Sequence, residues 1–549
     1  MPGFLLCLRN LLDKPKYICV LIILGLIAGC SDVLDTVPTD RLSSQVYWQA
    51  DKDAEYAANA VYRFLESPVT ILGRDAMSDL VRATFETSDE TKVEASIADS
   101  QTNIFQNTWN DMYSGIRRCN DYMANIGKIT PADEAKVNRL TSEVRTLRCY
   151  FYSRLVAYFG DVPLIATPIG ISESKTLTRT PVSEIYEFIY TEINDAVNYL
   201  PKTTAEKGRV TQGAALGILA RTMLFAAGNV TGTDSRANTY YERAKVAADA
   251  VIALGVYSLL PNYKDLFTYA NENNVEVVFD KQFIKDVYAN SVMNSFGAVS
   301  LGNNGSMMSP TIQLVDEYET KNGKKITEDA AYDPMNPYAN RDPRLSYTLY
   351  VPGDVLPNGT IYDSRPGWSN TADVIGASYQ VSKTGLLPKK YINPEDVGQS
   401  NRSNCGINLI IIRYAEILLT AAEARIELNT EPGVALGYIN DVRRRADVNM
   451  PQLVDITGQS ALREAVRHER MVELALEGNR FFDIRRWKIA ENVCNMNQIT
   501  GMRYVDKNTG QLVVITNDYK KKFTARDYLW PIPYNERQLN SNLTQNTGY

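Results

Sequence analysis

Apolar residues recur at intervals of three and four through much of the N-terminal half of the chain. One run extends from Val137 to Tyr158 and stops at Gly160, with Pro163 just beyond. This spacing places the apolar side chains on one face of an α-helix, and Gly and Pro are typical helix-ending residues. A second run extends from 182 to 200 and follows Thr180 as N-cap, with Pro181 at the first helical position. The pattern predicts two long amphipathic helices.

Two later segments, 211–227 and 240–254, carry small residues on one face. These residues are Gly213, Gly217, Ala220 and Ala227 in the first segment, and Ala244, Ala247, Ala248 and Val251 in the second. Small side chains let two helix backbones approach closely, and antiparallel pairs of about 34 residues are typical of tetratricopeptide repeats. A second pair is predicted over 408–426 and 434–446. We therefore expect a mostly α-helical fold.

Between these pairs, residues 261–405 lose the helical period and become rich in Gly, Pro, Asn and Tyr. A stretch of this length is too long for one connecting loop, so we predict an irregular lobe with short strands. Recognition commonly occurs on loops that a rigid scaffold supports.

Candidate ligand-binding residues come from this lobe, where aromatic side chains stand among Asn, Ser, Asp and Gly. They are Tyr288, Phe296, Tyr338, Trp368 and Tyr379, together with Asn303. Flat aromatic faces suit sugar rings, and amide side chains satisfy hydroxyl groups, so the composition is compatible with carbohydrate binding. The alternative is that each ring packs in a local core. Trp368, between Pro366-Gly367 and Ser369-Asn370, is the least core-like.

A search for catalytic chemistry finds no constellation of residues. His468 is the one histidine of the chain and lies in a charged helical stretch, where a hydrogen-bonded or solvated role is expected. Glu469, Glu473 and Glu477 share a helical face and could suggest a glycoside hydrolase. Nearby arginines favour ion-paired carboxylates instead: Arg470, Arg480, Arg485 and Arg486. We expect no enzyme activity, no metal site and no cofactor.

The N-terminus is typical of a lipoprotein signal peptide over residues 1–29. Lys14 and Lys16 precede the apolar run 18–28, and Ile27-Ala28-Gly29-Cys30 follows the pattern of a lipobox. Cys30 is therefore the predicted lipidation site, and the lipid would attach the protein to a membrane. The formal net charge of −6 makes nucleic acid an unlikely partner. One or two disulfides could form among the cysteines left after export, which are Cys119, Cys149, Cys405 and Cys494.

Several motifs strongly resemble the SusD/RagB family of outer-membrane nutrient-binding lipoproteins. The most specific are residues 474–487, which read LALEGNRFFDIRRW, and the tail, which reads YLWPIP at 528–533 and NLTQNTGY at 542–549. Supporting motifs are YFGDVPL at 158–164, DPR at 342–344 and RYAEILL at 413–419. Asn479 and Thr547 depart from the common family pattern.

The resemblance implies four tetratricopeptide-like helix pairs as a scaffold and a loop-rich lobe that carries the ligand site. The regions would be 30–260 (helical), 261–405 (ligand-binding lobe), 406–490 (returning helices) and 491–549 (tail). It also implies attachment to the outer membrane, facing the exterior, beside a SusC-like TonB-dependent barrel. The expected ligand is an oligosaccharide. A peptide-importing RagB-type role and a tetratricopeptide scaffold that binds only protein remain as alternatives.

Overall fold

The computed structural model describes residues 47–230 and 235–549. The predicted signal segment and Cys30 lie outside the described residues. The N-terminal half is helical, with these bounds: α4 (Asp51–Tyr62), α5 (Pro68–Gly73), α6 (Asp89–Glu94), α7 (Asn103–Asn125), α8 (Glu134–Phe159), α9 (Ile171–Ser174), α10 (Val182–Val197), α11 (Gln212–Asn229) and α12 (Arg236–Ala253).

The first predicted helix is confirmed as α8, which ends at Gly160 with a positive φ of 70°. The second is confirmed as α10, but its predicted N-cap is wrong. Asp161 accepts the hydrogen bond from the Val182 backbone N–H at 2.8 Å, and the Thr180 hydroxyl instead accepts one from Leu164 N–H. The cap comes from the turn after α8 because Val162 and Thr180 pair as a β-bridge.

The scaffold is an array in which each long helix packs against the next. Helix α7 contacts α8, α8 contacts α10, α10 contacts α11, and α11 contacts α12 closely, as predicted from the small residues. The array continues from α12 to α16 (Tyr414–Glu427), which contacts α17 (Pro432–Arg443) and α18 (Gln459–Glu473). Gly217 faces Ile412 and Ile417, so part of the small-residue face meets this later pair.

The helix predicted over 408–426 begins six residues late. Residues 409–413 form β6 (Leu409–Arg413), which pairs antiparallel with β2 (Val277–Lys281). A short run of β-branched residues such as Ile410 to Ile412 fits a buried strand as well as a helix. Pairing with β2, which is distant in the sequence, makes this run a strand. The helix period resumes at Tyr414.

The region between α12 and β6 is the irregular lobe that the sequence predicts. It contains α13 (Val292–Phe296), α14 (Ile312–Glu317), α15 (Pro343–Thr348), β3 (Met308–Pro310), β4 (Leu349–Tyr350) and β5 (Leu387–Pro388). Strand β3 pairs with β1 (Val81–Ala83), and β4 pairs with β5. Among the described residues each sheet has two strands, so no closed sheet forms. The mostly helical fold with a loop-rich lobe is confirmed.

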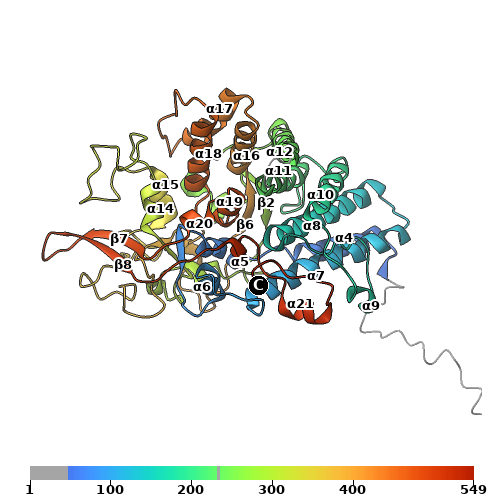
Figure 1. The fold of residues 1–549 in the computed structure, drawn as a ribbon, viewed down its shortest axis with the longest axis horizontal. Helices are drawn as coiled ribbons and strands as arrows, with labels where there is room; N and C mark the ends of the chain where they lie inside the picture. Colours follow the sequence, from blue (N-terminus) through green and yellow to red (C-terminus); the bar gives the residue numbers. More distant parts are fainter. Residues whose placement is uncertain (1–46, 231–234) are drawn as a thin grey trace, which may run out of the picture.

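The C-terminal part returns to both regions. It contains α19 (Arg480–Arg486), α20 (Ala490–Val493), the hairpin of β7 (Ile499–Val505) and β8 (Leu512–Asn517), and α21 (Tyr534–Leu539). Short 3₁₀ helices complete the chain: η2 (Arg74–Met77), η3 (Ile126–Lys128), η4 (Tyr263–Asp265), η5 (Tyr269–Asn271), η6 (Val299–Leu301), η7 (Pro394–Asp396) and η8 (Ala525–Tyr528). In Figure 1 the hairpin extends from the lobe, and α21 lies beside α7 at the scaffold.

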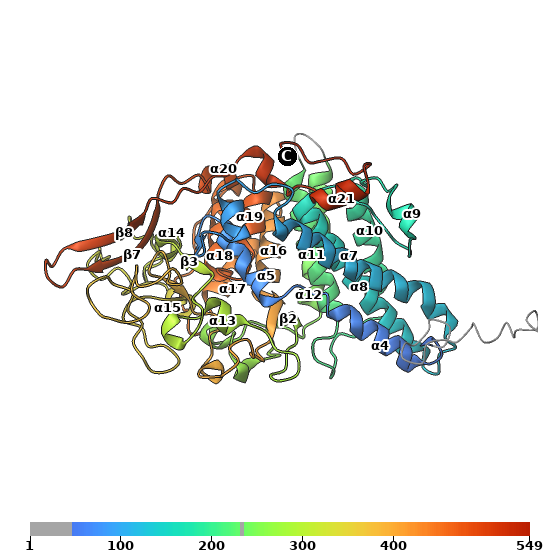
Figure 2. The ribbon, with the colours of Figure 1, turned by 90° about the horizontal axis from the view of Figure 1, so that it is seen from below.

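Helix α6 belongs to the N-terminal half but lies toward the lobe in Figure 1, and Figure 2 shows α5 between α13 of the lobe and α8 of the scaffold. The pairing of β1 with β3 also attaches this N-terminal segment to the lobe. The tail packs back onto α8, where Trp530 stacks on Tyr158 at 4.1 Å between ring centres and Asn546 donates to the Phe159 carbonyl oxygen. The family-like motifs at 158–164 and at the C-terminus therefore meet in space.

No helix within the described ranges is both long and apolar enough to cross a membrane. The four described cysteines are buried free thiols, so the structure contains no disulfide among Cys119, Cys149, Cys405 and Cys494. Burial raises the pKa of each thiol.

Candidate ligand-binding surface and the ion network behind it

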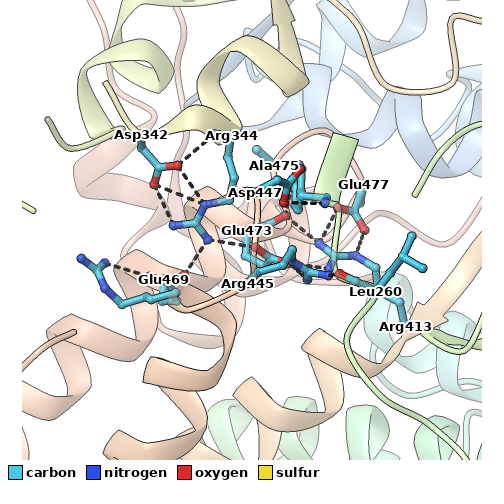
Figure 3. A network of polar contacts seen from close by, with 12 residues as sticks. Leu260, Asp342, Arg344, Arg413, Arg445, Asp447, Glu469, Glu473, Ala475 and Glu477 are labelled. Carbon is cyan, nitrogen blue, oxygen red and sulfur yellow. Dashed lines mark hydrogen bonds and ion pairs between the residues drawn. The ribbon is translucent and has the colours of Figure 1, made fainter. Parts of the chain in front are cut away.

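A buried network of charges joins the scaffold to the lobe (Figure 3). The Glu473 carboxylate on α18 forms ion pairs with three arginines. The distances are 2.8 Å to Arg344 Nη1 of α15, 2.6 Å to Arg413 Nη1 of β6 and 2.7 Å to Arg445 Nη2. The Glu473 side chain is 0% exposed. Glu469 also pairs with Arg344, at 2.6 Å. Each carboxylate has more than one charged donor, which a buried ion requires.

Glu473 and Glu477 of this network are held ionised. Burial is the largest effect on Glu473 and raises its pKa, but Arg445, Arg413 and Arg344 together outweigh it and hold that pKa well below its usual range. Glu477 follows the same pattern with Arg413 and Lys390, and its pKa is also lowered. A general acid needs a raised pKa, so these glutamates do not fit a glycosidase pair.

Ion pairing of the three glutamates is confirmed, but the predicted partners are wrong. Arg470 and Arg486 pair with Asp483 and Glu423. Arg480 pairs with Asp79 at 2.6 Å, and Arg485 donates to the Phe481 carbonyl oxygen. The true partners come from distant segments, because α15, β6 and the end of α17 converge on α18 (Figure 3).

His468 has the hydrogen-bonded role expected of it. Its Nε2 lies 2.8 Å from the backbone oxygen of Glu317. Within the described residues no group of three or more His, Cys, Asp or Glu side chains is arranged to hold a metal ion.

Tyr379 is the most exposed of the predicted ligand-binding residues, at 73%. Its ring centre lies 6.5 Å from that of Phe85, with the planes tilted by 57°. The turn 303–305 lies next to it, since a Cβ on Gly305 would meet the Gln380 backbone oxygen at 2.0 Å, and Gly305 has a φ of +86°. We call Tyr379, Phe85 and the turn 303–305 the Tyr379 surface.

Phe85 was not identified from the sequence because it lies outside the segment 261–405. It follows β1, which pairs with β3 of the lobe, and the Thr84 hydroxyl lies 2.7 Å from the Ser309 hydroxyl. A polar segment after a short apolar run gives no local signal of such a long-range pairing.

Trp368 is half-buried against the core. The Arg365 guanidinium lies over its ring, 3.6 Å from the ring centre, and Lys507 lies 5.9 Å from it. One face of the indole is therefore occupied by a cation.

Three other predicted residues have internal roles. Phe296 is 1% exposed and packs in the main core. Asn303 is buried and donates to the Ala298 carbonyl oxygen at 3.3 Å. The Tyr338 hydroxyl accepts a hydrogen bond from Arg503 N–H at 3.0 Å, and burial raises the pKa of this tyrosine. In this structure their side chains are turned inward rather than toward a ligand.

Tyr288 is 38% exposed, and the cavity that it lines contains no residue of the Tyr379 surface. Its ring stacks on Phe283, with 5.4 Å between ring centres and an angle of 8°. Its environment includes a cavity of about 390 Å³ that contacts α4 and β2. The ring contacts of Tyr288, Trp368 and Tyr379 in the described residues are with different neighbours, and none of these contacts joins two of the three.

Comparison with known proteins identifies the family. The model of the SusD family matches residues 275–549, and a second model, described as starch-binding and associating with the outer membrane, matches residues 44–224. The chain belongs to the SusD family.

Individual relatives cover most of the chain. The SusD-like protein P25 of Formosa agariphila is 26% identical over 95% of this chain and 97% of its own. The starch-binding protein SusD of Bacteroides thetaiotaomicron is 25% identical over 76% of this chain and 74% of its own. A solved SusD-like carbohydrate-binding protein of Bacteroides fragilis is 28% identical, covers 91% of this chain and 100% of its own, and superposes with a TM-score of 0.81.

Proposed function

We propose that the protein is a non-enzymatic, lipid-anchored glycan receptor of the outer membrane. It captures an oligosaccharide at the cell exterior and passes it to a SusC-like TonB-dependent barrel. Support for glycan binding comes from the starch-binding and carbohydrate-binding relatives. Support for the membrane comes from the second family model and from the lipobox ending at Cys30.

The Tyr379 surface is the observation that carries the proposal. An aromatic ring exposed to 73% next to a second ring offers flat apolar faces that are not needed for the core. Sugar rings present C–H groups that pack on such faces. The pairing of β1 with β3 positions the segment of Phe85, and the Lys383 backbone N–H donates to the Ser309 hydroxyl of β3, which positions the segment of Tyr379.

Titration calorimetry of the mature protein with a panel of oligosaccharides tests the proposal. We expect Tyr379→Ala to lower the affinity for the bound glycan at least fivefold, because stacking contributes about 1 kcal/mol. Tyr199→Ala is the matched control, since this exposed tyrosine lies after α10 on the scaffold. Binding of peptides but of no glycan would favour the RagB-type role instead.

The barrel and the anchor are tested separately. Affinity purification of the membrane-embedded protein should recover a large TonB-dependent barrel, and Cys30→Ala should release the protein from the membrane fraction. Recovery of a barrel without binding of any glycan or peptide would favour the alternative of a scaffold that binds only protein.

A further inference from the structure

Two cavities share Lys281, at the end of β2, and no residue of the Tyr379 surface lines either of them. The larger, about 660 Å³, is lined by the segment after α4 and by α7. The smaller, about 390 Å³, is lined by α4, the loop 206–209 and Tyr288. Arg63, Leu65 and Lys281 line both cavities. We call the two cavities together the Lys281 groove.

Lys281 is a buried residue that lines both cavities. Its Nζ donates to the Leu65 carbonyl oxygen at 2.5 Å and lies 5.7 Å from the ring centre of Tyr288. Burial is the main cause that lowers the pKa of Lys281, to about 8. The lobe strand is thereby attached to the scaffold at this point, so the groove has a fixed shape.

The groove has more positive than negative charge free to act on a ligand. Glu66 lines it but is already paired with Arg74 and Arg154. Arg63, Arg118 and Asp111 line it too, and within the described part of the chain their side chains make no hydrogen bond or ion pair. Over both cavities and within the described residues, four cations without an ion pair (Arg63, Arg118, Lys207 and Lys281) face two such carboxylates (Asp111 and Asp280), in a chain whose formal net charge is −6.

An aromatic face completes the groove. Tyr288 stacks on Phe283, which fixes its ring, and the residue is 38% exposed and lines the smaller cavity. The exposed part of a fixed ring can take the apolar side of a sugar ring. Arg63 lines both cavities, Tyr288 lines the smaller one and Arg118 lines the larger one.

We propose that the Lys281 groove is a second saccharide site, separate from the Tyr379 surface, that takes an acidic sugar. One sugar ring of an oligosaccharide packs on Tyr288 in the smaller cavity, and a carboxylate or sulfate ester of the same saccharide pairs with the guanidinium groups of Arg63 and Arg118 along the larger cavity, since their planar forks suit such oxyanions. Asp111 accepts hydrogen bonds from sugar hydroxyls. The inference rests on the proposed glycan binding and adds a class of sugar and a second place of binding.

Binding to an array of neutral, uronate-containing and sulfated oligosaccharides tests the site. We expect the mature protein to retain acidic members, and Arg118→Met and Arg63→Met each to weaken that retention at least tenfold without changing neutral binding. Arg117→Met is the matched control, because Arg117 is the neighbouring exposed arginine on α7 and lines a different cavity, of about 720 Å³. The uronate and sulfate arms identify which anion is preferred.

Two further variants locate the binding. Tyr288→Ala should weaken retention of short acidic saccharides, whereas Tyr379→Ala should leave it in place. If acidic members are not retained, or are retained equally by the arginine variants, the second site is wrong while neutral binding through Tyr379 still supports the proposed function. If no glycan of any kind binds, both proposals fail.

Discussion

The junction between scaffold and lobe and the Tyr379 surface use polar and aromatic residues in opposite ways. At the junction, Glu473 is 0% exposed, and each of its charged partners has further partners of its own. At the surface, Tyr379 is 73% exposed and contacts one neighbouring ring, Phe85. The charged side chains of the junction are used in internal contacts, whereas the Tyr379 ring at the surface is free to contact a ligand.

Several of the motifs that resemble the SusD family lie at the junction. Arg344 belongs to the motif at 342–344, Arg413 to that at 413–419 and Glu477 to that at 474–487, and Arg413 pairs with Glu477 at 2.8 Å. These motifs therefore encode how α15, β6 and α18 are held together. Because these side chains are used in internal contacts, the motifs identify the family but leave the ligand open.

The largest effect is expected when a charge is removed from the junction. Arg445→Met leaves Glu473 and Glu276 with one buried cation fewer, and losing one partner of a buried pair costs about 3–5 kcal/mol. Urea unfolding should show a loss of that size. Arg444→Met is the matched control, because this neighbour is 52% exposed and its one ion pair among the described residues is with Asp441, so the change should stay below about 0.5 kcal/mol. Equal losses of stability in both variants would mean that a buried charge of the junction contributes no more than an exposed one.

The sequence predicted the helices of the scaffold better than the long-range contacts that these helices make. Local periodicity identified α8, α10, α11 and α12 because each has a buried face of helical spacing. It failed at β6, where the pairing with β2 across more than a hundred residues decides between strand and helix. It also misassigned the ion partners, since Arg344 is 129 residues from Glu473 and no local pattern links them.

The candidate site was predicted by composition, which does not resolve individual residues. Tyr379 and Phe296 both stand among small and polar neighbours, yet one is exposed and the other is in the core. The difference comes from α13, which turns Phe296 inward. Phe85 was missed because the pairing of β1 with β3 is non-local.

A smaller effect is expected at Asp75, a carboxylate at the edge of the junction. It accepts a hydrogen bond from Gly478 N–H at 3.0 Å, and burial, the main cause, raises its pKa to about 7. The native state therefore holds this proton at a higher pH than the unfolded chain, whose Asp pKa is about 3.9, so stability increases as pH falls through 7. From pH 8.5 to 6 the contribution is about 1.4 kcal/mol.

Asp75→Asn should abolish that part of the pH dependence and should be more stable than the wild type at pH 8.5. Urea unfolding of both proteins at pH 8.5 and pH 6 measures it, and the other titrating groups cancel in the difference. A difference that does not change with pH would mean that Asp75 is ionised at both values, and that the junction stabilises this carboxylate as it does Glu473.

The smallest effect on stability is expected at the Tyr379 surface. Tyr379→Ala removes a ring with one aromatic neighbour, and the Lys383 Nζ bond to the Tyr379 backbone oxygen remains, so the free energy of unfolding should change by less than about 0.5 kcal/mol. Phe296→Ala provides the contrast, because removing a buried Phe costs about 3–5 kcal/mol. Glycan affinity should fall only in the first variant at temperatures where both are folded. A loss of stability above about 1 kcal/mol in Tyr379→Ala would mean that this ring belongs to a local core, and the surface would then lose the freedom that distinguishes it from the junction.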